Sequence, residues 1–203
     1  MNYGELKTHF KDVLNRSDIT DAQAVRFISD GIGRIERQLR TAMNEKVKNY
    51  TITAQTSSIT LPADFIETVS LYHSDREIRR VPMSQFRKLV NNTYAGKPDV
   101  YTRLQQDLLL HPQPTDGTVT LYYYGQFDDM SEDSDENILA AAAPDLIIYS
   151  ALTYASDFYL DERTEQFETK YQRFLLEVQE QANDQEMSGG TQVINPAYSY
   201  GDY

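Results

Sequence analysis

Apolar residues recur every three or four positions near both ends of the chain, which is the spacing of one helix face. The segment from Tyr3 to Leu14 is predicted to be a short amphipathic helix that ends before Ser17. Thr20 is a favourable N-cap for a second and longer helix. We expect one buried stripe along this second helix, formed by Val25, Ile28, Ile32, Ile35, Leu39 and Met43.

Two glycines interrupt the second helix, in the sequence Asp30-Gly31-Ile32-Gly33-Arg34. A Gly-x-Gly pair that binds phosphate follows a strand and is completed by a third glycine or a lysine. Neither feature is present here. We therefore expect both glycines to allow another helix to pack closely.

Between about Val47 and Gly125 the period of the hydrophobic pattern changes from 3.6 to 2. Short runs of β-branched and aromatic residues are separated by turn residues such as Pro62, Pro82 and Gly117. This pattern predicts an antiparallel β meander. One or two helical turns are expected within it, from Ser84 to Val90.

The helical period returns after an acidic segment, 128–137, which we expect to be a solvated linker held extended by repulsion between its carboxylates. Pro144 suits the first turn of a helix, where its missing N–H leaves no hydrogen bond unmade. This helix is apolar on most sides, so we expect it to be central and buried. The residues that we expect to be buried in it are Leu146, Ile147, Tyr149, Ser150, Ala151, Leu152, Ala155 and Phe158.

A last amphipathic helix is predicted from Asp161 to about Glu186, with one stripe formed by Phe167, Tyr171, Phe174, Leu175 and Val178. Gly189 and Gly190 end this helix. The chain that follows has no periodicity but keeps apolar residues that nothing local can cover. We interpret it as an extended arm that binds a partner. The candidate contact residues are Val193, Ile194, Pro196, Tyr198, Tyr200 and Tyr203.

The expected fold is α+β and mainly helical. Helices from the N- and C-terminal parts of the chain form one bundle, with the antiparallel β meander inserted between them and the arm extending from the C-terminal end. The corresponding segments are 1–46 and 138–187 for the bundle, 47–127 for the β part, 128–137 for the acidic loop and 188–203 for the arm.

Composition restricts the functional classes. The 203 residues carry a net charge of −12. Residues 1–127 contribute +2 and residues 128–203 contribute −14, which opposes tight wrapping of nucleic acid. The absence of cysteine excludes thiolate chemistry and disulfides. No apolar run approaches the roughly 18 residues of a membrane span.

Side chains suited to catalysis do not cluster in the sequence. His9, His73 and His111 lie in three different predicted elements, without the four-residue spacing of a helical zinc site. No serine lies in a G-x-S-x-G turn. We expect neither an enzyme nor a cofactor.

The acidic loop partly matches a calcium-binding loop. Asp129, Ser131 and Asp133 lie at its first, third and fifth positions, but the sixth position is Ser134 and the twelfth is Ala140. A calcium loop requires glycine and glutamate at these two places. We therefore expect no metal here.

One alternative function remains open. Arg26, Arg34, Arg37 and Arg40 lie opposite the apolar stripe of the second helix. Such a face could bind the phosphates of a nucleic acid, although a solvated helix surface has the same pattern.

Several segments resemble the head-tail adaptor (connector) proteins of tailed bacteriophages, in the version with a β insertion. They are SITLPADFIETVSLY, REIRRVPMSQFRKL, KPDVYTRLQQDLLLHPQP, TVTLYYYGQF and the long stretch that begins AAAAPDLIIYSALTYASDFYL. Their patterns are L-P-x-D-F, P-x-x-Y and A-P-D-L-x-x-Y, and the resemblance covers roughly residues 1–187.

This resemblance implies a structural virion protein at the head-tail junction, assembled in the cytoplasm of a bacterial host. Such proteins form a ring, generally a dodecamer, that binds the portal above and tail or nozzle proteins below. DNA passes through the ring without specific binding. The resemblance also implies that the contact residues of the arm bind the portal or a neighbouring subunit.

Overall fold

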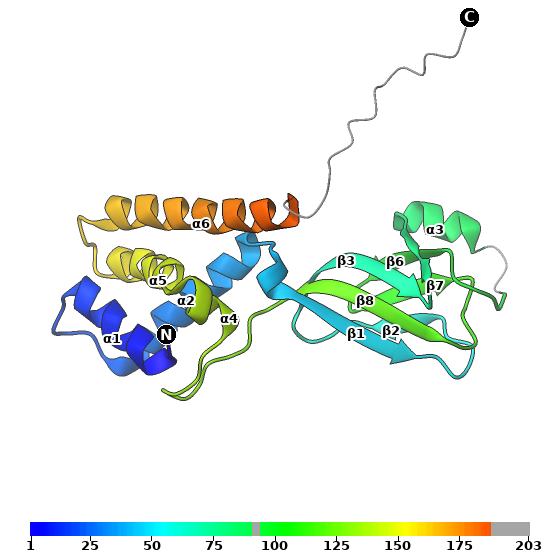
Figure 1. Ribbon diagram of the computed structural model, residues 1–203, viewed down its shortest axis with the longest axis horizontal. Helices are drawn as coiled ribbons and strands as arrows, with labels where there is room; N and C mark the ends of the chain where they lie inside the picture. Colours follow the sequence, from blue (N-terminus) through cyan, green and yellow to red (C-terminus); the bar gives the residue numbers. More distant parts are fainter. Residues whose placement is uncertain (91–93, 188–203) are drawn as a thin grey trace, which may run out of the picture.

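The computed structural model describes residues 1–90 and 94–187 and consists of a helical bundle joined to a pair of β-sheets (Figure 1). The predicted α+β fold, mainly helical, is confirmed. The expected arm, 188–203, lies outside the described residues.

The first two helices begin at polar caps that the sequence supplies. In α1 (Tyr3–Leu14), Asn2 accepts a hydrogen bond from the backbone of Glu5, whose carboxylate accepts one in return. In α2 (Asp21–Gln38), Thr20 and Gln23 form the same reciprocal capping box. The predicted N-cap at Thr20 is confirmed.

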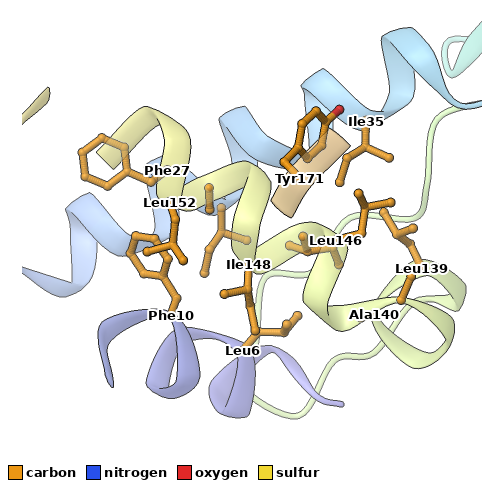
Figure 2. Packing of buried hydrophobic residues seen from close by; sticks show 14 of the residues in the cluster. Leu6, Phe10, Phe27, Ile35, Leu139, Ala140, Leu146, Ile148, Leu152 and Tyr171 are labelled. Atoms are coloured by element: carbon orange, nitrogen blue, oxygen red, sulfur yellow. The ribbon is translucent and has the colours of Figure 1, made fainter. Parts of the chain in front are cut away.

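Three further helices complete the bundle. These are α4 (Ile138–Ala142), α5 (Pro144–Phe158) and α6 (Thr164–Met187). Pro144 occupies the first turn of α5, as predicted. Nine of the fifteen residues of α5 are buried, because this helix contacts α1, α2 and α6 (Figures 1 and 2).

The α2 and α5 helices approach each other closely at Gly31. A Cβ added to Gly31 would lie 2.8 Å from the backbone nitrogen of Ala151. Beside it, the buried hydroxyl of Ser150 donates to the carbonyl of Gly31 at 3.0 Å. Gly31 therefore has the packing role that we expected. Gly33 does not, because a Cβ there would meet only the end of the Arg37 side chain.

The buried face of α2 differs from the predicted stripe at both ends. Val25 is exposed, while Ala24 and Phe27 are buried instead. Met43 lies beyond the helix, in the 3₁₀ turn η1 (Ala42–Asn44). The prediction assumed that one helix continues as far as Met43, but α2 ends at Gln38.

The strands form two four-stranded sheets and not one meander of neighbours in sequence. The first sheet has the order β1-β8-β3-β4 and the second has the order β2-β7-β6-β5. Their bounds are β1 Glu45–Thr51, β2 Ser58–Thr60, β3 Phe65–His73, β4 Arg76–Glu77, β5 Arg79–Arg80, β6 Val100–Leu104, β7 Asp107–His111 and β8 Thr118–Gly125. All pairs are antiparallel except β5 with β6. The expected turn of helix is α3 (Met83–Leu89).

The two sheets share one apolar core, separate from that of the bundle. Leu71, Val119 and Leu121 come from the first sheet, and Leu108 and Leu110 come from the second. Alternation along each strand places these residues on the inner faces. The chain therefore has two large cores, one between helices and one between sheets, and a smaller buried cluster of Val81, Phe86 and Val100 near α3.

Arg40 and Glu36 connect the bundle to the sheets. The guanidinium of Arg40 donates to the last carbonyls of α2, at Glu36 and Leu39, and also to the carboxylate of Glu67 in β3. The carboxylate of Glu36 accepts from the backbone N–H of Phe127 at 2.8 Å. Because burial disfavours its charge, the pKa of Glu36 is raised. The two segments that connect the bundle to the sheets are therefore both hydrogen-bonded at the C-terminal end of α2.

The acidic segment is an ordered turn, so the expectation of an extended linker is wrong. The carboxylate of Asp135 accepts from the backbone N–H groups of Ser131 and Glu132, both at 2.8 Å. The carbonyl of Asp133 accepts from the N–H of Gly4, and its carboxylate pairs with Lys7. These contacts with α1 offset the repulsion between carboxylates on which the prediction was based.

Substituting the two helical glycines separates packing from helix propensity. We expect Gly31→Ala to destabilise the fold by about 1–3 kcal/mol, because its Cβ meets the backbone of α5. Gly33→Ala should stabilise it by about 0.5–1 kcal/mol, because its Cβ makes only an ordinary contact with the end of the Arg37 side chain. Urea unfolding followed by circular dichroism measures both. Equal effects at the two positions would contradict the proposed contact.

Candidate interaction surfaces

The turn between α5 and α6 exposes large apolar side chains. We call Phe158, Tyr159 and Leu160 the apolar tip. Phe158 is 61% exposed and Leu160 is 89% exposed. The ring of Phe158 lies against those of Phe27 and Tyr159, at centroid distances of 5.7 and 4.9 Å. An aromatic cluster thus holds the tip in place while Leu160 projects into solvent.

Leu160 has an unfavourable backbone conformation. It follows the C-cap of α5 with a φ of 54°, in the left-handed region where glycine is normal. The Leu160 N–H donates to the carbonyl of Asp157, and the Asp161 N–H donates to that of Ser156. This is a Schellman motif, and a leucine in its left-handed position is strained by about 1–2 kcal/mol. The exposed side chain offers no packing within the chain to offset that strain.

An ion pair supports the turn that carries the tip. The guanidinium of Arg163 donates to both carboxylate oxygens of Asp161 and to the carbonyl of Leu14 at the end of α1. The hydrogen bonds from Arg163 lower the pKa of Asp161 to about 2. The guanidinium of Arg16 also lies over the ring of Tyr159, 4.2 Å from its centroid. The tip is therefore a positioned surface.

Sequence reasoning missed this surface. Phe158 continues the apolar pattern of α5, so we expected it to be buried, but it is the last residue of the helix and is exposed. The available signal was a leucine at the place where a helix usually ends in glycine, directly before the charged residues Asp161, Glu162 and Arg163.

A second surface lies in the β part, where α3 covers the outer face of the second sheet only partly. A hollow of about 490 Å³ is lined there by apolar side chains and one cation, namely Met83, Phe86, Val90, Leu104, Leu109 and Arg87. Leu104 is 49% exposed, whereas Phe86 is buried. The run of three leucines in β7 was the signal for this surface, since it places an apolar side chain on both faces of the strand.

The segment that contains α3 is rich in basic residues, and one of them, Arg87, lines the hollow. From Arg76 to Val90 the chain has five basic side chains and one acidic side chain. Arg87 and Lys88 lie in the last turn of α3, and Arg79 and Arg80 form β5. Within the described part of the chain none of these four has an ion pair. This end of the molecule is therefore a cationic, partly apolar surface.

The four arginines proposed for nucleic-acid binding do not form one face. Arg34 makes a two-point ion pair with Glu168 at 2.6 and 2.8 Å and lies 4.1 Å from the ring centroid of Tyr171. Its hydrogen bonds lower the pKa of Glu168. Arg40 lies beyond α2 and binds Glu67. Only Arg26 and Arg37 of this set lie on α2 without an ion pair among the described residues, so the structure gives this alternative no support.

Within residues 1–90 and 94–187, no three histidine or acidic side chains converge as a metal site would require. No helix in the same ranges is both long and apolar enough to cross a bilayer. The arm residues proposed as partner contacts, Val193, Ile194, Pro196, Tyr198, Tyr200 and Tyr203, lie outside the described residues.

A family model described as SU10 adaptor protein matches residues 1–194. No curated protein matches the chain. The family match includes the bundle, both sheets, the apolar tip and the hollow.

The strain at Leu160 predicts a stabilising substitution. We expect Leu160→Gly to raise the free energy of unfolding by about 1 kcal/mol, because glycine adopts the left-handed conformation freely. For a chain of this size the melting temperature should rise by about 2–4 °C. Leu160→Ala is the control, since it removes the apolar side chain but keeps the Cβ. If alanine stabilised the protein as much as glycine, the backbone would not be the cause.

Proposed function

The chain belongs to the SU10 adaptor protein family, and we propose that it forms a ring, a dodecamer, beneath the portal at the head-tail junction. The family is one of phage head-tail adaptors, so the chain is a structural component of the virion that interacts with portal and tail proteins. The family is not an enzyme class. In our proposal the ring seats the tail, is assembled in the host cytoplasm and leaves a channel for DNA.

The apolar tip is the observation that carries the docking part of this proposal. An 89% exposed leucine in a strained backbone position is costly to an isolated chain. The cost is explained if a partner buries Leu160 and Phe158, because burial of large apolar side chains dominates the energy of protein interfaces. We propose that the portal ring is this partner.

Electrostatics supports passage of DNA through the ring without binding. Each chain carries a net charge of −12, so twelve copies carry −144. A channel in an assembly of this charge repels phosphate groups over about a Debye length. DNA would then move past the ring without adhering to it.

The C-terminal arm adds a second contact in this proposal. Val193, Ile194, Pro196, Tyr198, Tyr200 and Tyr203 bind the portal or a neighbouring subunit. The support is their composition, because apolar residues and tyrosine recur at protein interfaces. A short contact repeated around a ring gains strength from the number of copies.

The first test is the mass of the assembly. We expect light scattering of the chain mixed with the portal ring of the same phage to show one stoichiometric ring complex. A chain that stays monomeric beside an unchanged portal would contradict the proposal.

A charge placed on the tip tests how docking occurs. Leu160→Glu should fold normally but weaken portal binding by at least about tenfold, because an interface buries carboxylates poorly. The control is Leu176→Glu, at a leucine of α6 that is 55% exposed and lies away from the tip. Titration of the portal by light scattering measures both. Equal binding by the two variants would show that the tip is not the docking surface.

A further inference from the structure

The hollow beside α3 is suited to one class of ligand, an extended segment that has apolar side chains and negative charge. Its floor and walls are apolar, at Phe86, Leu104 and Leu109, and Arg87 lines one side. Arg87 has no ion pair within the described part of the chain. An apolar peptide with acidic residues would satisfy both properties of this surface.

The chain itself contains such a segment. Residues 190–203 contain one acidic residue and no basic residue. They include Val193, Ile194 and Tyr198, which suit an apolar hollow, and Asp202, which suits the cation Arg87 in its lining. The segment therefore offers apolar side chains to the hollow and one carboxylate to Arg87.

The reach of this segment allows it to bind another subunit. At least 16 residues follow Met187, the last residue of α6. A chain of this length spans up to about 53 Å when extended. In Figure 1, α6 ends above the junction between the bundle and the sheets, on the side where α3 lies.

We propose that residues 190–203 of one subunit occupy the hollow lined by Met83, Phe86, Arg87, Val90, Leu104 and Leu109 of the neighbouring subunit. This inference rests on the proposed ring. Each subunit then offers one arm and one hollow, so the contact is heterologous and a closed ring leaves no hollow empty. The arm links neighbouring subunits, whereas the apolar tip binds the portal.

Photo-crosslinking in the full chain tests this proposal. Tyr198 is replaced by the photoreactive p-benzoylphenylalanine in ¹⁵N-labelled chains, which are mixed with unlabelled natural chains and assembled on the portal ring. We expect crosslinks between position 198 of a labelled chain and residues 83–109 of an unlabelled chain. Crosslinks found only within labelled chains at low labelled fraction, or only to the portal, would overturn the proposal.

Two substitutions, one inside the hollow and one outside it, test whether the arm binds there. Leu104→Glu in the unlabelled chain should reduce the crosslink yield by at least about tenfold, because it places a carboxylate against the apolar side chains of the arm. The control is Leu89→Glu, at a leucine of α3 that is 46% exposed but does not line the hollow. Equal yields from the two variants would contradict the assignment of the hollow.

The mass of each sample distinguishes a failure of the arm contact from a failure of the proposed ring. If a ring complex assembles but no crosslink to the hollow forms, the arm contact is wrong and the proposed function stands. If no ring assembles on the portal, the proposed function itself is wrong. Circular dichroism confirms that each variant is folded before it is compared.

Discussion

The close contact between α2 and α5 at Gly31 holds the rest of the structure together. These helices come from opposite sides of the β part in the sequence, and Ser150 hydrogen-bonds to Gly31 across 119 residues. The α5 helix in turn contacts α1 and α6, so one close approach closes the bundle (Figure 2). It also fixes the end of α2, where Arg40 and Glu36 hold both crossings to the sheets.

This arrangement leaves two different surfaces open, one at the end of α5 and one beside α3. The apolar tip is held by the aromatic cluster at the end of α5 and by the Arg163–Asp161 pair. The hollow is formed where the short helix α3 leaves part of a sheet uncovered. Each surface borders a buried cluster, because Tyr159 packs against the core of the bundle and Phe86 belongs to the cluster near α3. In our account each is kept for a partner, which explains why the chain tolerates a strained leucine and an open apolar hollow.

Sequence periodicity predicted the helices well because their signals are local. Thr20 and Pro144 were recognised as start signals from the residues beside them, and the structure confirms both. The sheet order was not predictable in this way. The β1 strand pairs with β8, so that Glu45 lies opposite Tyr124, and no local pattern encodes a pairing so distant in sequence.

The surfaces were harder to predict for a related reason. Phe158 has the spacing of a core residue, and its exposure depends on where the neighbouring helices end. The acidic turn looked like a free linker because its partners, Gly4 and Lys7, lie near the other end of the chain. Burial and charge pairing depend on the three-dimensional arrangement, which one sequence shows only in part.

Electron cryomicroscopy of the head-tail junction assembled from this chain and its portal is the most direct test of the account. We expect a closed ring in which Leu160 and Phe158 are buried against the portal, while density from a neighbouring arm fills the hollow at Leu104 and Arg87. A ring in which Leu160 remains in solvent would contradict the central claim that the strained tip exists for docking.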